Sequence, residues 1–268
     1  MPLITGGEGG IAFGKALTAN RSLVELNMRF NRIGFGLDRS INAFCEALAV
    51  NTGLRWLDLA QNELMGRSGG NAVGEALKVL RPLERPAAEP HIGGRAFCSC
   101  SCSLAPGAAV APALLLHLRP ISQAHVTNAR VQVNRTLRVL NLEKNELGAE
   151  GGLPLAKALA SNTALTSLSV AHNELGTAGA AFADALRAST CLCSLDLSKN
   201  EIGADEGAAL GDALRTSRCK ELNLKGNRIG RGAAQIAAAL ADNSSLVSLD
   251  VSRLRAAADR GPPPTTCA

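Results

Sequence analysis

The sequence predicts an α/β solenoid, a row of short repeats in which each repeat joins one strand to one helix. A phrase with two leucines around a polar residue, followed by an asparagine, recurs along the chain, as in LNLEKNELG at 140–148. Over the second half, its first leucine returns every 27 or 28 residues. Between the phrases stand blocks whose apolar residues recur at i, i+3 and i+4, the spacing of a helix. Self-similarity at this period indicates stacked repeats with one shared core.

The strands are predicted from the Leu-x-Leu core of each phrase. Alternating residues of a strand point to opposite faces, so the two leucines face the same way. A further leucine stands three residues before each Leu-x-Leu and begins the full phrase. In chain order, this leucine is Leu23, Leu54, Leu137, Leu165, Leu192 and Leu246, with Cys219 in its place before the last one.

The helices are predicted from the blocks between the phrases. Their apolar triplets are Phe13/Ala16/Leu17, Phe44/Ala47/Leu48, Val73/Ala76/Leu77, Leu155/Ala158/Leu159, Phe182/Ala185/Leu186, Leu210/Ala213/Leu214 and Ile236/Ala239/Leu240. Stacked strands lie about 4.8 Å apart, whereas packed helices need about 8–10 Å. We therefore expect the stack to curve, with the strands inside and the helices outside.

An asparagine and a glycine mark the turn that follows each strand. The asparagine amide can satisfy the backbone groups that the turn frees. The asparagines are Asn31, Asn62, Asn145, Asn173, Asn200 and Asn227. A glycine permits backbone angles that other residues rarely adopt, and the glycines are Gly34, Gly148, Gly176, Gly203 and Gly230.

The full phrase, L-x-x-L-x-L-x-x-N-x-I/L-G, resembles the ribonuclease-inhibitor type of leucine-rich repeat. That type is also found in the sensor ends of NOD-like receptors and in the Ran GTPase-activating protein. The resemblance covers roughly 3–78 and 133–252. It implies a horseshoe of about seven repeats, with an inner parallel sheet, outer helices and binding on the concave face.

One segment breaks the period, because Leu54 and Leu137 are 83 residues apart. Removing residues 79–132 restores the six-residue step that usually separates the last leucine of a helix from the next phrase. We therefore divide the chain into repeats at 1–78, a disordered insertion at 79–132, further repeats at 133–252 and a disordered tail at 253–268.

Three interpretations of the insertion stay open. Cys98, Cys100 and Cys102 with a nearby histidine would supply four metal ligands, although C-x-C-x-C is not the usual zinc spacing. A disordered regulatory loop is the second interpretation. The third is an intron retained in frame. The segment begins with valine, whose codons start with GT, and ends with glutamine, whose codon can be CAG, and these are the usual first and last letters of an intron.

Charge and cysteine content restrict the partners. The net charge is +5, but the insertion and the tail account for all of it, so the repeats carry no basic bias toward nucleic acid. The sequence has neither a signal-peptide pattern at its start nor an apolar run long enough for a membrane span. Cys191, Cys193 and Cys219 stand on or beside the phrase, and we interpret them as reduced thiols of a cytoplasmic protein.

Candidate binding residues are the variable positions of the strands, because these face the concave surface. Trp56, the only tryptophan, is expected to face solvent, where tryptophan favours binding; the alternative is packing against Arg29 or under the insertion. His172 stands alone in a variable column and is interpreted as a surface residue. The candidates are Glu25, Asn27, Arg29, Trp56, Asp58, Asn141, Glu143, Asp196, Glu221, Asn223 and Lys225.

The predicted function is a non-enzymatic protein-interaction module without cofactor or metal, which binds a protein partner on the concave face. No phosphate-binding loop, nucleophile elbow or Ser/His/Asp arrangement appears in the sequence. Two alternatives follow from the resemblance. One is a GTPase-activating protein of the Ran type, although that family's acidic C-terminal stretch is missing here. The other is a fragment of a NOD-like receptor.

Overall fold

The computed structural model describes residues 7–34, 38–78 and 134–255. Within them, seven three-residue strands form one parallel sheet whose strand order follows the chain. The strands are β1 (Glu25–Asn27), β2 (Trp56–Asp58), β3 (Val139–Asn141), β4 (Ser167–Ser169), β5 (Ser194–Asp196), β6 (Glu221–Asn223) and β7 (Ser248–Asp250). Every strand is centred on the first leucine of a predicted Leu-x-Leu, in which Met or Val takes the second place in three repeats, and this confirms the strand prediction.

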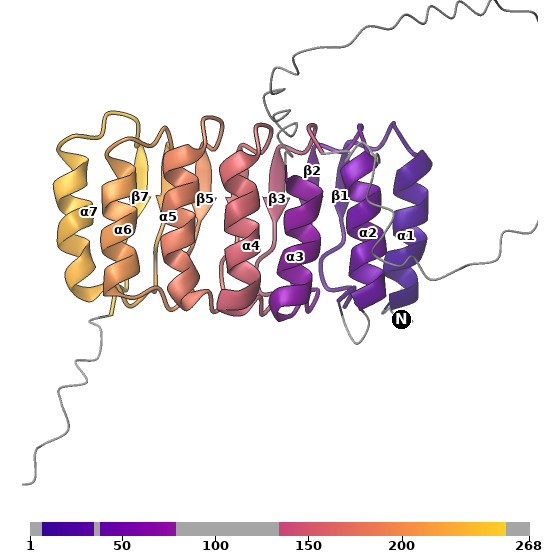
Figure 1. Cartoon of the computed structure of the whole chain (residues 1–268), viewed down its shortest axis with the longest axis horizontal. Coiled ribbons are helices and arrows are strands. Elements are labelled where there is room, and N and C mark those ends of the chain that lie inside the picture. The colour runs from indigo at the N-terminus through magenta and orange to yellow at the C-terminus, as the bar shows by residue number, and fades with distance from the viewer. Residues whose placement is uncertain (1–6, 35–37, 79–133, 256–268) are drawn as a thin grey trace, which may run out of the picture. The chain divides into compact units, whose positions relative to one another are not determined.

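The helices line up along one face of this sheet, each packed against its neighbours in chain order (Figure 1). They are α1 (Gly7–Ala19), α2 (Asp38–Val50), α3 (Gly66–Leu77), α4 (Gly148–Ser161), α5 (Gly179–Ala188), α6 (Ala204–Leu214) and α7 (Ala233–Leu240). Short 3-10 turns, η1 (Gly176–Ala178) and η2 (Gly230–Gly232), lead into α5 and α7. The predicted helical blocks are thus confirmed.

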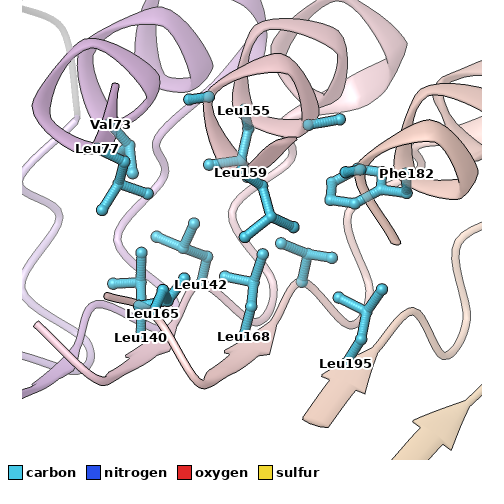
Figure 2. Packing of buried hydrophobic residues seen from close by; sticks show 14 of the residues in the cluster. Val73, Leu77, Leu140, Leu142, Leu155, Leu159, Leu165, Leu168, Phe182 and Leu195 are labelled. Carbon is cyan, nitrogen blue, oxygen red and sulfur yellow. The ribbon is translucent and has the colours of Figure 1, made fainter. Parts of the chain in front are cut away.

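The core lies between the two layers and is mostly aliphatic. Figure 2 shows Leu140, Leu168 and Leu195 pointing from the strands toward Leu159 and Phe182 on the helices. All five side chains are at most 2 % exposed. Burying one such side chain stabilises the fold by about 1.5–3 kcal/mol. Because each repeat contributes to the same continuous cluster, no single repeat is expected to fold alone.

The asparagines of the turns after the strands, here called the strand-exit asparagines, form a ladder from repeat to repeat. The Oδ1 atom of each one accepts the backbone N–H of the preceding one at 2.7–3.0 Å. The Nδ2 atom donates to backbone carbonyls of its own strand or of the strand before, as Asn145 does to Leu142 and Leu59 at 2.9 Å. The predicted role in the turn is confirmed, and the bonds between repeats are an addition.

A second set, the helix-exit asparagines, ends most helices. They are Asn20, Asn51, Asn134, Asn162 and Asn243. Asn51 shows the pattern: its Nδ2 donates to Leu17 O of the repeat before at 2.9 Å, while its Oδ1 accepts the N–H of Leu54 at 2.8 Å. The sequence held this signal, since each of these residues stands three places before the first leucine of a phrase.

Register continues across the break in the period. Strands β2 and β3 pair directly, with Leu57 opposite Leu140. Asn134 N–H donates to Ala76 O, as Asn51 N–H donates to Ala47 O. The predicted insertion at 79–132, with Cys98, Cys100 and Cys102, lies outside the described residues. Of the predicted tail, only 253–255 is described, and there Arg255 N–H donates to Asn227 O at 2.8 Å.

The glycines of the strand-exit turns serve two purposes. Gly148 has φ +61°, which favours a residue without Cβ. Gly34 does not have a positive φ, but a Cβ added there would lie 2.3 Å from Glu63 O of the next repeat. Left-handed angles are also held by charged residues beside the asparagine, such as Lys144 (φ 55°) and Glu146 (φ 54°).

Candidate functional site

The sheet face opposite the helices carries the predicted binding residues in three columns, one residue per strand in each. The middle column shares one structural role. The Oδ1 atom of each aspartate or asparagine accepts the backbone N–H two residues later, at 2.8–3.1 Å. Its members with this bond are Asn27, Asp58, Asn141, Asp196, Asn223 and Asp250. Since either residue type makes the bond, the turn does not require the negative charge of an aspartate.

Three aspartates therefore place a charge on the face that the turn does not need, but they differ in exposure. Asp58 is only 6 % exposed, so its carboxylate offers little surface to a partner, contrary to our expectation from its column. Asp196 and Asp250 are partly exposed. Hydrogen bonds from the hydroxyl and then the N–H of Ser252 lower the pKa of Asp250, which keeps it a carboxylate.

These two aspartates border a cavity of about 250 Å³ over β5, β6 and β7. We call it the acidic hollow, and its lining residues are Ser194, Leu195, Asp196, Glu221, Leu222, Asn223, Ser248 and Asp250. Strand alternation turns Ser194 and Asp196 away from the helices, opposite to Leu195. Three carboxylates and no basic residue line the hollow. Asn223 Nδ2 donates to Asp196 Oδ2 at 3.2 Å, which joins two of the strands.

The first column contains Glu25, Trp56 and Glu221. Trp56 lies between Glu25 and Val139 in the sheet and is partly buried, so the expected solvent-facing tryptophan is only in part accessible. Both glutamates are exposed. Glu221 reaches the acidic hollow, whereas Glu25 lies on β1, at the other end of the sheet.

In the third column, Arg29 and Glu143 form an ion pair at 3.6 Å across the intervening Ala60. The Arg29 guanidinium also lies 5.4 Å from the centre of the Phe30 ring. Exposed pairs of this kind contribute about 0–1 kcal/mol, so both side chains remain available to a partner. Lys225 stands three strands beyond Glu143, in the turn after β6 and outside the acidic hollow, where its charge helps to lower the pKa of Asp250.

His172 stands in the turn after β4. Partial burial, and then the positive charges of Lys199 and Lys144, lower its pKa, which favours the neutral imidazole. No group of three or more histidine, cysteine or acidic side chains suited to a metal ion occurs within residues 7–34, 38–78 and 134–255.

The structure thus gathers some of the predicted residues and separates others. Asp196, Glu221 and Asn223 meet in one cavity, and Arg29 meets Glu143. Glu25, Asn27, Trp56 and Asn141 lie on other strands of the same face, and Asp58 is buried. Ser194, Ser248 and Asp250 belong to the same columns and also line the hollow. The sequence did not single them out, because a residue's column does not show whether it lies at a cavity.

A family model described as "Leucine Rich repeat" matches residues 19–34, 133–156, 161–182 and 188–211. Each matched stretch includes a strand or its flanking turns. The chain contains leucine-rich repeats. Its unclosed parallel sheet, with one helix for each strand in the described part, agrees with a solenoid of about seven repeats.

Among solved structures, 57 chains match. Leiomodin-1 Actin-Binding Site 2 is 24% identical, with 44% of this chain and 71% of that chain covered and a TM-score of 0.41. The tropomodulin C-terminal domain of Caenorhabditis elegans is 13% identical, with 86% and 95% covered and a TM-score of 0.44. LegL7, a leucine-rich repeat-containing protein of Legionella pneumophila, is 14% identical, with 91% and 68% covered and a TM-score of 0.46. No curated protein sequence matches the chain.

Among the described helices, none has the length and apolar character needed to cross a membrane. The described cysteines, Cys45, Cys191, Cys193 and Cys219, are free thiols. Burial raises the pKa of Cys219 to about 11.

Proposed function

We propose that this leucine-rich repeat protein is a non-enzymatic interaction module that binds a protein partner on the sheet face, and that the acidic hollow receives a lysine or arginine side chain of that partner. The observation that carries the proposal is the hollow itself. It is bordered by Asp196, Glu221 and Asp250 without a basic neighbour in its lining. A cation placed there meets three carboxylates, which favours association with a basic segment.

The rest of the face suits an extended partner. Trp56 and the pair of Arg29 with Glu143 lie several strands from the hollow, so a segment that crosses the strands contacts both. The sheet is held by backbone bonds and by the strand-exit ladder, so little conformational entropy is lost when a partner binds. The affinity is therefore expected to depend on the partner's charge and on its fit across the strands.

We further propose that the protein acts inside the cell, where cysteines stay reduced. Several thiols act as hydrogen-bond donors to backbone carbonyls. Cys191 Sγ lies 3.4 Å from Asn162 O, and Cys219 Sγ lies 3.4 Å from Cys193 O. A disulfide would remove these bonds. Nucleic acid is not proposed as a partner, because the acidic hollow is lined by three carboxylates and the repeats carry no basic bias.

The test replaces Asp196 and Asp250 with asparagine, which keeps the turn bond through Oδ1 but removes the charge. A fluorescent hexa-arginine peptide amide serves as the cationic probe, and hexa-glutamate as its opposite. We expect hexa-arginine to bind the unaltered protein, to weaken with salt, and to lose at least tenfold in affinity to Asp196→Asn/Asp250→Asn.

The matched control is Asp205→Asn/Asp212→Asn, which removes the same charge from α6 on the helical side. Equal losses in both variants would show nonspecific attraction and contradict the proposal, as would unchanged binding in both. The fluorescence of Trp56, the only tryptophan, provides a second readout of whether a bound segment reaches β2.

A further inference from the structure

The C-terminal end of the solenoid presents an apolar face that no described residue covers. A cavity of about 100 Å³ opens there, and its lining is Ala233, Ile236, Ala237, Leu240, Leu249, Val251 and Leu254. Of the lining residues, Leu240 is 43 % exposed and Val251 39 %, and Val247, just before β7, is 82 % exposed. Between repeats inside the chain, the equivalent face is covered by the strand and helix of the next repeat.

The N-terminal end also exposes large apolar side chains. Leu23 is 36 % exposed, whereas Leu54, at the same place in the next repeat, is buried. Phe30 (61 %) and Val24 (45 %) stand nearby at positions that inner repeats also expose. The first and last repeats lie at opposite ends of the row of helices (Figure 1). Val24 and Val247 occupy the same position of their repeats, immediately before β1 and β7.

The backbone edges of these two faces are complementary. Inside the sheet, the carbonyl before each strand accepts the N–H that begins the next strand, as Val24 O does from Trp56 at 3.1 Å and Lys220 O does from Ser248 at 2.9 Å. By the same pattern, Val247 O is an acceptor that faces outward after β7. On the outer side of β1, the N–H of Glu25 is the matching donor.

The side chains repeat this complementarity. Helix-exit asparagines donate Nδ2 to the last helix leucine of the repeat before, as Asn51 does to Leu17 O and Asn243 to Leu214 O. Asn20 has the same position in the first repeat, and Leu240 O is the matching acceptor in the last. Likewise, the bond from Asn223 to Asp196 between neighbouring strands has its counterpart in Asn27 and Asp250.

We propose that the last repeat of one chain stacks on the first repeat of a second copy, so that the parallel sheet continues from β7 into β1 of the next molecule. Residue 248 then lies opposite residue 25, and Val247 opposite Val24. The contact is head to tail, so each copy uses two different surfaces, and the assembly grows by addition at either end.

A second copy is the occupant that these observations favour. The backbone edge, the helix-exit asparagine donor and the pair of Asn27 with Asp250 all match the chain's own first repeat at one single offset in numbering. An unrelated apolar segment would fill the cavity but would not supply the bond to Leu240 O. Native proteins commonly protect open strand edges by charges or by coverage, and the residue before β7 is an exposed valine.

The experiment uses two blocked variants of the full chain. Leu240→Lys/Val251→Lys blocks the C-terminal face, and Leu23→Lys blocks the N-terminal face. All three side chains are exposed, so the fold is expected to persist, and circular dichroism verifies this. Sedimentation velocity over a wide concentration range should show the unaltered chain associating and each variant alone staying monomeric.

Mixing the two variants is the decisive measurement, because one intact face remains on each. We expect a 1:1 dimer of twice the monomer mass that grows no further, since both remaining ends carry lysines. In a second mixture, Val24→Cys and Val247→Cys chains should form a mixed disulfide with each other in preference to either homodimer.

The proposal is overturned if the unaltered chain is monomeric throughout, which would also be the outcome if the terminal residues cover these faces. It is equally overturned if a blocked variant associates as the unaltered chain does, or if the mixture fails to dimerise. Hexa-arginine binding by the same samples tests the acidic hollow separately through Asp196 and Glu221 on β5 and β6, whereas Asp250 belongs both to the hollow and to the proposed contact.

Discussion

The turns after the strands and the turns after the helices use the same residue, asparagine, but for different purposes. The Oδ1 of a strand-exit asparagine accepts an N–H from the repeat before it, as Asn145 Oδ1 accepts the N–H of Asn62 at 2.9 Å. The Oδ1 of a helix-exit asparagine accepts an N–H of its own turn, as Asn162 Oδ1 accepts the N–H of Leu165 at 2.7 Å. The first kind joins neighbours through both ends of the amide, whereas the second kind joins them through Nδ2 alone.

The sequence reflects this difference. The strand-exit ladder runs without a gap from Asn31 to Asn227. The helix-exit set is replaced by Ser189 and Ser217 in two repeats, and Ser217 Oγ is buried without a hydrogen-bond partner. The break in the period also falls at a helix exit. Turns whose bonds are mostly local tolerate substitution and insertion, while turns that join repeats do not.

The strongest test of this comparison exchanges one asparagine of each kind for serine. Asn145→Ser leaves buried groups of two repeats without partners and should lower the free energy of unfolding by about 3–5 kcal/mol. Asn162→Ser should lower it by about 1–2 kcal/mol, since serine already serves at position 189. Urea denaturation followed by circular dichroism measures both. Equal losses would contradict the distinction.

Deleting residues 79–132 should leave the fold intact, because Asn134 already bonds to Ala76 as Asn51 bonds to Ala47. A shorter connection lowers the entropy of the unfolded chain, so we expect the unfolding free energy to rise by about 2–3 kcal/mol. Thermal unfolding of both chains provides the measurement. A control deletion within 165–192, which removes a whole repeat phrase, should instead be strongly destabilising. If the 79–132 deletion unfolds the protein, our division of the chain is wrong.

Cys219, which takes the place of the first leucine in the phrase of β6, makes the free energy of unfolding fall at alkaline pH. Its pKa is about 11 in the folded protein against 9.0 for an ordinary thiol. The unfolded chain therefore loses this proton first, and the stabilisation present below pH 9 is lost as the pH rises toward 11. The expected loss is about 1.4 kcal/mol at pH 10. Urea titrations at pH 8 and pH 10 should show a smaller difference for Cys219→Ala. An unchanged difference would exclude this thiol as the cause.

The smallest expected effect concerns the two serines. Ser217→Ala removes a buried hydroxyl without a partner and should raise the unfolding free energy by up to about 1 kcal/mol. Ser189→Ala should lower it by a similar amount, because Ser189 Oγ accepts the N–H of Leu192 at 3.2 Å. Parallel denaturation curves of the two variants check the opposite signs, and a gain from Ser189→Ala would contradict the assignment.

The sequence predicted every strand and helix because their spacing is local and repeated. It also predicted the columns of the sheet face, since alternation decides which side a residue takes. It did not predict that Asp58 is buried while Asp196 borders a cavity, because depth depends on neighbouring repeats. The bonds between strand-exit asparagines were likewise hidden, since they join residues 27 to 83 positions apart. The helix-exit asparagines were readable from spacing and were overlooked.

The direction of the strand-exit ladder has a consequence during synthesis. The turn of each repeat is completed by an asparagine of the following repeat, so a growing chain always ends in an unfinished turn. At about 5–20 residues per second, the next asparagine usually arrives about 1–5 seconds later. Between Asn62 and Asn145, which are 83 positions apart, the ribosome needs about 4–17 seconds. During this interval the sheet edge of the first two repeats has no partner strand. We therefore expect chaperone binding to matter most at this stage of synthesis.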